Sequence, residues 1–202
     1  DGSTLLLTPA AMITLYPHIY RSLAYGIDDV TPVCTGGTVA FGLGVGPAVP
    51  ASVKNVADYL AWAKANPAQA SYGSPGAGSP PHFVAALLGK VSGTDLNHVP
   101  YRGSAPGIQD LLGRQVPAFS SPIGDYLPHL KSGKLRLLAT SGAARSRFTP
   151  DVATYAEQGL RDLTMSEWYG FFLPGKAAPD VVARAAQAIA AAVNTPETIE
   201  AF

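Results

Sequence analysis

The sequence predicts an α/β fold with a mostly parallel sheet, and three observations carry this prediction. Short apolar segments alternate with segments of helical spacing along the whole chain, which is typical of strand–helix–strand units. The 21 glycines and 18 prolines fall largely between these segments. With 202 residues, 47% of them hydrophobic, the chain can bury a sizeable core without a disulfide or a metal. One large domain or two small lobes both fit this length.

The first part of the chain opens on an apolar strand, Thr4–Leu7. Its consecutive apolar residues predict burial on both faces, as in parallel sheets, and the strand ends at the turn Thr8-Pro9-Ala10-Ala11. A second apolar strand with alternating glycines is expected at Thr38–Val45. Ser52 is the expected N-cap of a helix over Val53–Ala65.

The rest of the chain repeats this alternation. Further strands are expected at Ala70–Tyr72, Leu96–Val99, Val116–Phe119, Leu135–Ala139 and Met165–Leu173. Further helices are expected at Pro80–Lys90, Ala105–Leu112, Pro122–Lys131 and Pro179–Val193. Thr154 and Glu157 have the spacing of a capping box, and Gly159 is the matching stop. Thr195 and Pro196 begin a last helix about two turns before the end, so we expect an internal piece of a longer protein.

Composition excludes several classes of function. Fourteen basic residues balance fourteen acidic ones, whereas a nucleic-acid binder normally has a basic excess. The longest apolar stretch, Val39–Val49, is interrupted by three glycines and Pro47 and cannot span a bilayer. Cys34 is the only cysteine, so no internal disulfide forms. The four histidines have no metal-ligand spacing, and neither a metal nor a cofactor is expected.

The most unusual segment is Tyr72–His82, which reads YGSPGAGSPPH. It follows a strand and precedes a helix, with Ser79 suited to the N-cap and Pro80 to the first turn. Glycines let backbone N–H groups face a ligand, and N–H groups at a helix start favour an anion. The segment is therefore either a cradle for a carboxylate or phosphate, or a tight turn that binds nothing.

Known catalytic and phosphate-binding patterns do not fit this segment. Gly73 and Gly78 have P-loop spacing, but Ser79 stands where the lysine is required. Pro81 replaces the third glycine of the dinucleotide fingerprint. A nucleophile elbow would need glycine where Tyr72 stands. Nucleotide-binding and hydrolase functions are therefore disfavoured.

A second strand-to-helix turn occurs at Tyr101–Pro106. Ser104 is expected to cap the next helix, and Arg102 either contacts a carboxylate with both of its terminal nitrogens or is simply exposed. The two turns should meet at the carboxyl ends of their strands, where open α/β sheets bind ligands. His82 either contacts a ligand or packs, and the other three histidines look structural. The aromatic segment Trp168–Phe172 is expected to be a buried strand, one ring of which could line a cleft.

Several segments together resemble one family, the substrate-binding receptors of tripartite tricarboxylate transporters, often called Bug proteins. The matching segments, in the family's order and spacing, are Asp1–Leu6, Ala65–Pro67, Tyr72–Ser79 with His82, His98–Gly103, Asp110–Val116, Leu127–His129 with Gly133–Arg136, Pro150–Val152 with Ala156–Gly159, and Trp168–Gly170. The resemblance implies a two-lobed periplasmic-binding-protein fold (type II), with one lobe incomplete here. Residues 1–40 and 171–202 would form part of lobe 1 and residues 41–170 lobe 2, with crossover strands near 38–45 and 168–173.

The resemblance and the two loops together give a set of expected ligand contacts. They are Thr8, Pro9, Ala10, Ala11, Ser74, Gly76, Ala77, Gly78, Ser79, Arg102, Gly103 and Ser121. Relatives often carry an acidic residue that meets a ligand's amino group at the position of Ser121, which favours plain mono- or dicarboxylates here. The resemblance also implies that the proline- and glycine-rich first loop of the family, which precedes this segment, contributes to ligand binding.

The expected function is that of a bacterial periplasmic receptor. It would bind a small carboxylate as a monomer, deliver it to membrane permease subunits, bind no nucleic acid and catalyse no reaction. Any export signal is expected to have been removed or to lie outside this segment. The nearest alternative is a ligand-sensing domain of a signalling or regulatory system. An enzyme is a third alternative, and it would need Ser74 or Ser79 within reach of His82 as a nucleophile and base.

Overall fold

The computed structural model describes residues 2–201, and the chain forms two compact units. Unit 1 comprises the residues up to Thr38 and those from Glu167 onwards, and unit 2 comprises Val39–Ser166. Asp1 and Phe202 lie outside the described residues. The chain passes from one unit to the other within β2 (Val30–Val45) and at the start of β7 (Ser166–Pro174).

Unit 2 contains a mixed sheet. Its strands are β2, β3 (Ser71–Ser74), β4 (Asn97–Pro100), β5 (Ala118–Pro122) and β6 (Arg136–Thr140). β3 runs parallel to both β4 and β5, whereas β2 runs antiparallel to β5 and β6. The prediction of a mostly parallel sheet was therefore wrong, because β2 enters from unit 1 and runs against the strands of the β–α units. Apolar patterning does not reveal that direction.

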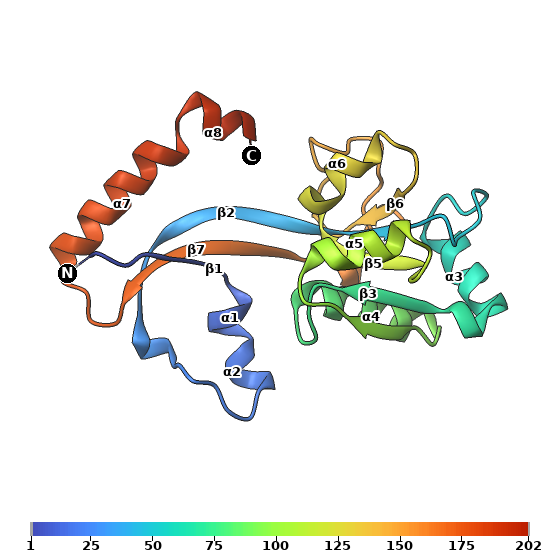
Figure 1. Ribbon diagram of the computed structural model, residues 1–202, viewed down its shortest axis with the longest axis horizontal. Coiled ribbons are helices and arrows are strands. Elements are labelled where there is room, and N and C mark those ends of the chain that lie inside the picture. The colour runs from blue at the N-terminus through green and yellow to red at the C-terminus, as the bar shows by residue number, and fades with distance from the viewer. Residues whose placement is uncertain (1, 202) are drawn as a thin grey trace. The chain divides into compact units, whose positions relative to one another are not determined.

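Helices cover both faces of this sheet (Figure 1). One face packs against α3 (Val56–Ala65) and α4 (Pro80–Ser92), and the other packs against α5 (Ser104–Leu112) and the 3₁₀ turn η3 (Ile123–Tyr126). Alternation along β5 separates the two cores, since Ala118 faces the first and Phe119 the second. The remaining elements of unit 2 are η2 (Pro67–Gln69), α6 (Leu127–Leu130) and η4 (Arg161–Leu163).

Unit 1 is built on β1 (Leu6–Pro9), which pairs antiparallel with β7, and β7 neighbours β2. Its helices are α1 (Ala11–Thr14), α2 (Tyr16–Ile19), η1 (Ile27–Asp29), α7 (Pro179–Val193) and α8 (Pro196–Ala201). The predicted burial of the first strand on both faces was wrong, because β1 is an end strand and Leu5, Leu6 and Leu7 are all exposed. In β7, Phe172 is buried but Trp168 is 37% exposed, so that strand is only partly buried.

Three predicted helices differ from the structure. α3 begins after Asn55, whose side chain accepts a hydrogen bond from the Asp58 amide at 2.8 Å, and not after Ser52. α5 is preceded by Gly103, and Ser104 is its first residue rather than its cap. The predicted helix Pro122–Lys131 is split into η3 and α6.

Other local predictions are confirmed. α7 has the predicted bounds, and the Thr198 amide donates to Thr195 Oγ1 at the start of α8. The Thr154–Glu157 capping box forms both of its hydrogen bonds, at 2.7 and 3.1 Å, although the residues between form a turn rather than a helix. Within residues 2–201, no helix combines the length and apolar character needed to cross a bilayer.

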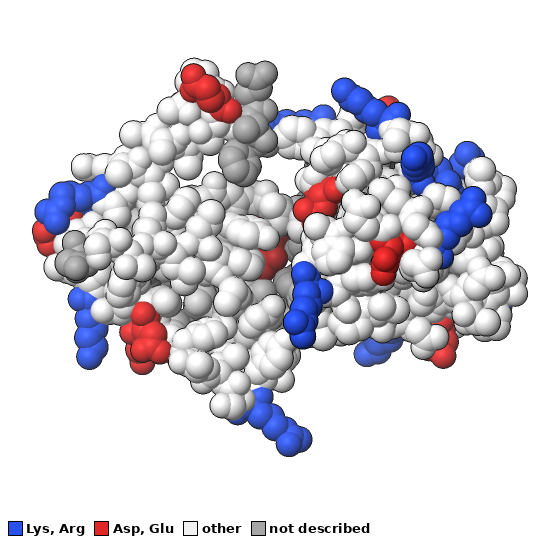
Figure 2. Space-filling model, in the orientation of Figure 1, with Lys and Arg blue, Asp and Glu red and all other residues white. Residues whose placement is uncertain are grey.

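The net charge of the whole chain is zero, but the two units carry opposite net charges. Unit 2 has eleven Lys and Arg against seven Asp and Glu, a net charge of +4, and unit 1 has three against seven, a net charge of −4. Figure 2 shows most of the blue Lys and Arg side chains at the right-hand end, over unit 2.

Candidate ligand-binding loops

The two predicted strand-to-helix turns are joined in unit 2. β3 and β4 are parallel neighbours, so the loops that follow them emerge at the same edge of the sheet. The Tyr101 amide donates to the Ser74 carbonyl and the Gly103 amide to the Pro75 carbonyl, both at 2.9 Å. Gly103 has a φ of +101°, which favours glycine. The expectation that both turns share one edge is confirmed.

The Gly76 carbonyl organises the first of these loops. It accepts hydrogen bonds from the Ser79 hydroxyl at 2.7 Å, the Ser74 hydroxyl at 3.1 Å and the Ser79 amide at 3.3 Å. Gly78 follows with a φ of +76°, so this turn requires glycine there. Ser79 stands at the N-cap of α4 as predicted, but its side chain makes no capping bond. Pro80 and Pro81 have no N–H, so α4 offers fewer amides than an ordinary helix start.

Two stacked histidines form hydrogen bonds with this loop. The His98 Nε2 atom lies 2.7 Å from Ser74 Oγ, and the Gly78 amide donates to His82 Nδ1 at 3.1 Å. The two imidazole rings lie 3.9 Å apart between centroids, with an interplanar angle of 22°. Because the Ser74 hydroxyl donates its one proton to Gly76, we assign the proton of this contact to His98 Nε2.

Both rings are held in the neutral form. Burial lowers the pKa of His98 to about 4, with a smaller contribution from the neighbouring His82. Burial also lowers the pKa of His82. At neutral pH the Gly78 amide is therefore bonded to an uncharged acceptor that belongs to the protein itself.

The segment around Ser121 lies at the end of β5 in unit 2. The Ser121 side chain is fully buried, and its hydroxyl lies 2.5 Å from Asp125 Oδ2 and 2.9 Å from Ser104 Oγ. Its neighbour Ser120 donates to the Pro81 carbonyl at 2.8 Å, which ties β5 to the first turn of α4. Arg102 is exposed, and its side chain forms no hydrogen bond or ion pair with residues 2–201.

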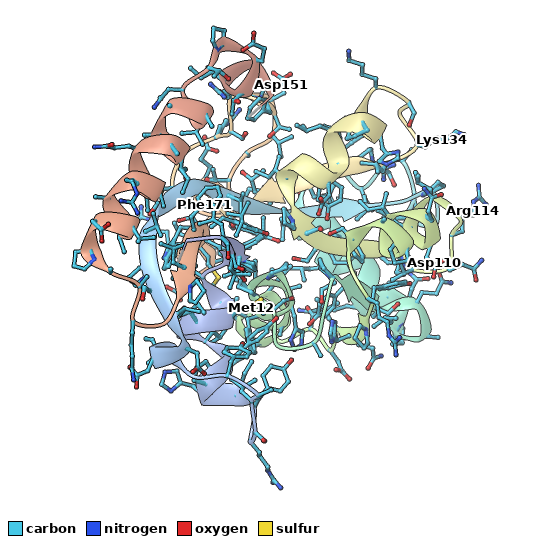
Figure 3. All side chains as sticks on the ribbon, turned by 60° about the vertical axis from the view of Figure 1, so that its left-hand side comes forward. Met12, Asp110, Arg114, Lys134, Asp151 and Phe171 are labelled. Atoms are coloured by element: carbon cyan, nitrogen blue, oxygen red, sulfur yellow. The ribbon has the colours of Figure 1, made fainter. Side chains whose placement is uncertain are left out.

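The turn Thr8–Ala11 in unit 1 is already occupied by a carboxylate. The Ala11 amide donates to Glu167 Oε1 at 3.0 Å, and the Ala10 amide donates to the Trp168 carbonyl at 2.9 Å. Thr8 is buried and its hydroxyl contacts the Met12 sulfur at 2.8 Å; Met12 is labelled in Figure 3. Burial raises the pKa of Glu167, and the Ala11 hydrogen bond opposes that rise.

The enzyme alternative required Ser74 or Ser79 beside His82, and neither of these pairs is formed. His82 accepts the Gly78 amide and contacts neither Ser74 nor Ser79 by a hydrogen bond. Ser74 does meet His98, but it is fully buried and donates to a carbonyl rather than to the ring. Among residues 2–201, no three His, Cys, Asp or Glu side chains cluster as metal ligands would.

Sequence reasoning missed two side chains of these loops. His98 looked structural, yet it supports Ser74 from the neighbouring strand. Its role depends on the pairing of β3 with β4, which a single sequence does not reveal. Glu167 did leave a signal, since it is the lone acid inside the apolar segment 165–173.

Comparison with known proteins shows the family to which the chain belongs. Residues 1–202 match the family described as tripartite tricarboxylate transporter family receptor. Protein BugT of Bordetella pertussis is 30% identical over 204 residues, covering all of this chain and 62% of BugT. The chain spans about three fifths of the length of the curated relatives it matches.

Solved structures agree with the fold. A periplasmic transporter is 31% identical with a TM-score of 0.92, covering 100% of this chain and 67% of that one. An R. palustris protein solved with adipate is 27% identical with a TM-score of 0.90, covering 98% of this chain and 66% of that one. The fold is thus that of two-lobed periplasmic binding proteins, and the chain belongs to the receptor family of tripartite tricarboxylate transporters.

Proposed function

We propose that this chain is the ligand-binding part of a bacterial periplasmic receptor that captures a small organic acid and delivers it to a membrane permease. The two compact units would be its two lobes. Family membership supports a receptor, and the relative solved with adipate supports a carboxylate as ligand. The proposal assigns no reaction to the chain and treats it as acting in transport.

The observation that carries this proposal is the Gly78 amide bonded to the neutral ring nitrogen of His82. A ligand carboxylate can replace that acceptor and gain a charge-assisted hydrogen bond, which is roughly twice as strong as a neutral one. The loop therefore suits an anion better than a neutral ligand.

The ligand contacts proposed in unit 2 are the loop residues and their neighbours. They are Ser74, Gly76, Ala77, Gly78, Ser79, Arg102, Gly103 and Ser121. Ser74 acts by holding the Gly76 carbonyl, since it is fully buried. Arg102 is exposed beside Gly103 and free to approach a carboxylate. Thr8, Pro9, Ala10 and Ala11 are proposed contacts in unit 1.

A thermal-shift screen tests the proposal directly. The protein would be heated with acetate, succinate, malate or adipate, and with the matching uncharged amides. Ligand at about a hundred times its dissociation constant should add roughly 2.7 kcal/mol of stability. We expect a shift with one or more acids and none with the amides. Equal shifts with acids and amides, or no shift with any acid in a chain that includes the family's first loop, would contradict it.

A further inference from the structure

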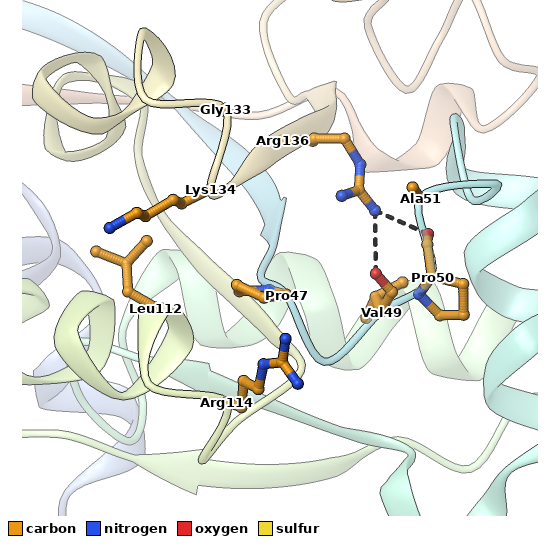
Figure 4. A pocket seen from close by; sticks show the side chains of 9 residues that line it. All are labelled: Pro47, Val49, Pro50, Ala51, Leu112, Arg114, Gly133, Lys134 and Arg136. Atoms are coloured by element: carbon orange, nitrogen blue, oxygen red, sulfur yellow. Dashed lines mark hydrogen bonds between the residues drawn. The ribbon is translucent and has the colours of Figure 1, made fainter.

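Unit 2 contains a hollow of about 520 Å³ that is separate from the glycine loop. Its lining consists of Pro47, Val49, Pro50, Ala51, Leu112, Arg114, Gly133, Lys134 and Arg136, shown in Figure 4. Three of these nine residues are cations and none is an acid. Figure 3 places Arg114 and Lys134 on the same side of unit 2.

The hollow lies at the opposite end of the sheet from the ligand loops. In the β2–β5 pair, Val45 stands beside Ala118 and leads to Pro47 in the hollow, whereas the other end of the pair reaches Pro122. α5 likewise begins beside Ser121 at Ser104 and ends in the hollow at Leu112. A ligand in the hollow would therefore be distinct from one held by the Gly76–Ser79 loop.

Arg136 is held in place within the hollow. Its Nη2 atom donates to the Pro50 carbonyl at 3.0 Å and to the Val49 carbonyl at 3.3 Å, as the dashed lines in Figure 4 mark. Its Nε atom is buried without a hydrogen-bond partner. A buried donor without a partner is destabilising, so the fold keeps this guanidinium in position at a cost.

The backbone conformation of Arg114 is also unfavourable. It follows the Gly113 C-cap of α5 and has a φ of +65°, a left-handed conformation in which helices usually place glycine. In α5 the glycine is instead the C-cap, Gly113, one residue before the left-handed position. An arginine at a helix end could serve that end by binding its carbonyls, but the Arg114 side chain makes no hydrogen bond or ion pair with residues 2–201.

Lys134 adds a third positive charge to the same lining, also without an ion-pair partner among residues 2–201. Three cations around one hollow repel one another, and a concave surface lined by one sign of charge concentrates the potential. Unit 2 as a whole carries a net charge of +4. An anion in the hollow would offset the repulsion among these cations.

We propose that this hollow, lined by Arg114, Lys134 and Arg136, is a second binding site, for a small multivalent oxyanion such as phosphate or a compound bearing phosphate or carboxylate groups. Arg136 is pre-positioned by its carbonyl bonds, so less conformational freedom is lost on binding. Arg114 follows α5 and Lys134 precedes β6, so the two cations come from different elements that line the hollow.

The test compares Arg114→Gly with Lys176→Gly. Lys176 in unit 1 is the other non-glycine residue with positive φ among those described, at +63°. Both changes remove an unfavourable backbone conformation, so each should raise Tm in the absence of phosphate. Inorganic phosphate should raise the Tm of the wild type and of Lys176→Gly above that seen with chloride at equal ionic strength. In Arg114→Gly, affinity for phosphate should fall about tenfold or more.

Two further variants locate the effect. Arg136→Leu should remove the phosphate-dependent shift, and Gly78→Val should keep it because the glycine loop lies at the other end of the sheet. The proposal is overturned if phosphate acts no differently from chloride on the wild type. It is also overturned if Arg114→Gly keeps the full phosphate shift, or if that variant lowers Tm, since Arg114 would then stabilise the fold by itself.

Discussion

Each of the two candidate ligand segments has a backbone amide after a strand. The acceptor bonded to that amide is a carboxylate in unit 1 and a neutral imidazole in unit 2. In unit 1, the amide of Ala11 after β1 is bonded to the Glu167 carboxylate at 3.0 Å. In unit 2, the amide of Gly78 after β3 is bonded to the neutral His82 ring at 3.1 Å. Both amides follow a strand and both have an acceptor supplied by the protein. They differ in the charge of that acceptor.

The difference predicts which segment takes a ligand carboxylate. A carboxylate approaching Ala11 would meet the buried Glu167 side chain, and two carboxylates sharing one site repel each other. A carboxylate approaching Gly78 would displace a neutral acceptor. We therefore propose that the ligand's carboxylate binds in unit 2 rather than at the Thr8–Ala11 turn.

The largest effect is expected from Gly78→Val. Gly78 has a φ of +76°, which a β-branched residue rarely adopts, and the new side chain would block the amide. Affinity for the bound acid should fall by about a hundredfold or more, a loss of roughly 2.7 kcal/mol, measured by calorimetry. Gly76→Ala is the matched control, since a Cβ there meets no atom within 4 Å. Equal losses in both variants would contradict the role of Gly78.

The histidine pair predicts that unit 2 loses stability in acid. The unfolded chain protonates His98 near its ordinary pKa of 6.5, whereas the folded chain does so only near 4. Between these values the unfolded state binds more protons, so stability falls as the pH falls. After allowance for partial exposure the loss is about 1–2 kcal/mol. His98→Gln should flatten this slope in thermal melts from pH 7 to 4, and an unchanged slope would contradict the assignment.

Ser74→Ala should loosen the loop without unfolding unit 2. The hydroxyl links His98 Nε2 to the Gly76 carbonyl, and its loss should cost about 1 kcal/mol. Acid binding should weaken several-fold, and the Gly78 amide should exchange with solvent faster. Ser132→Ala, which removes an exposed hydroxyl bonded to the His129 carbonyl, serves as the control. Equal hydrogen-exchange rates for the Gly78 amide in Ser74→Ala and the wild type would count against the linkage.

The smallest effect is expected in unit 1, from Glu167→Gln. The raised pKa of Glu167 means that folding favours its protonated form, so its contribution to stability is lost as the pH rises. The amide oxygen of glutamine can still accept from Ala11 while removing the buried charge. At pH 8 the variant should melt roughly 2–4 °C higher, with the gap closing towards pH 4. Asp180→Asn, in an exposed ion pair with Arg184, should change Tm little.

Local sequence patterns predicted the elements better than their relations. α7 and the loop after β3 were predicted because helical spacing and glycine–proline punctuation act over a few residues. The direction of β2 was not predictable, because it depends on pairing with β5 some 75 residues away. The exposure of Leu5–Leu7 depends in the same way on β1 having one neighbour.

For the candidate site too, local features were predicted and long-range contacts were not. The Gly76–Ser79 loop was predicted from its glycines, but the hydrogen bonds of the Gly78 and Ser79 amides were not. Gly78 is bonded to His82, which lies four residues later and was considered as a ligand contact, a packed side chain or a catalytic base. His98 and Glu167 lie 24 and 156 residues from their partners, and no pattern within one sequence brings such residues together.

The amide resonances of Gly78 and Ala11 give the most direct test of the central claim. In ¹H–¹⁵N spectra, the acid with the largest thermal shift would be titrated into the protein. Replacement of the His82 acceptor by a carboxylate should move the Gly78 resonance strongly downfield, because the new hydrogen bond is charge-assisted. The Ala11 amide, still bonded to Glu167, should move little. A large shift at Ala11 with Gly78 unmoved would contradict the assignment of the carboxylate to unit 2.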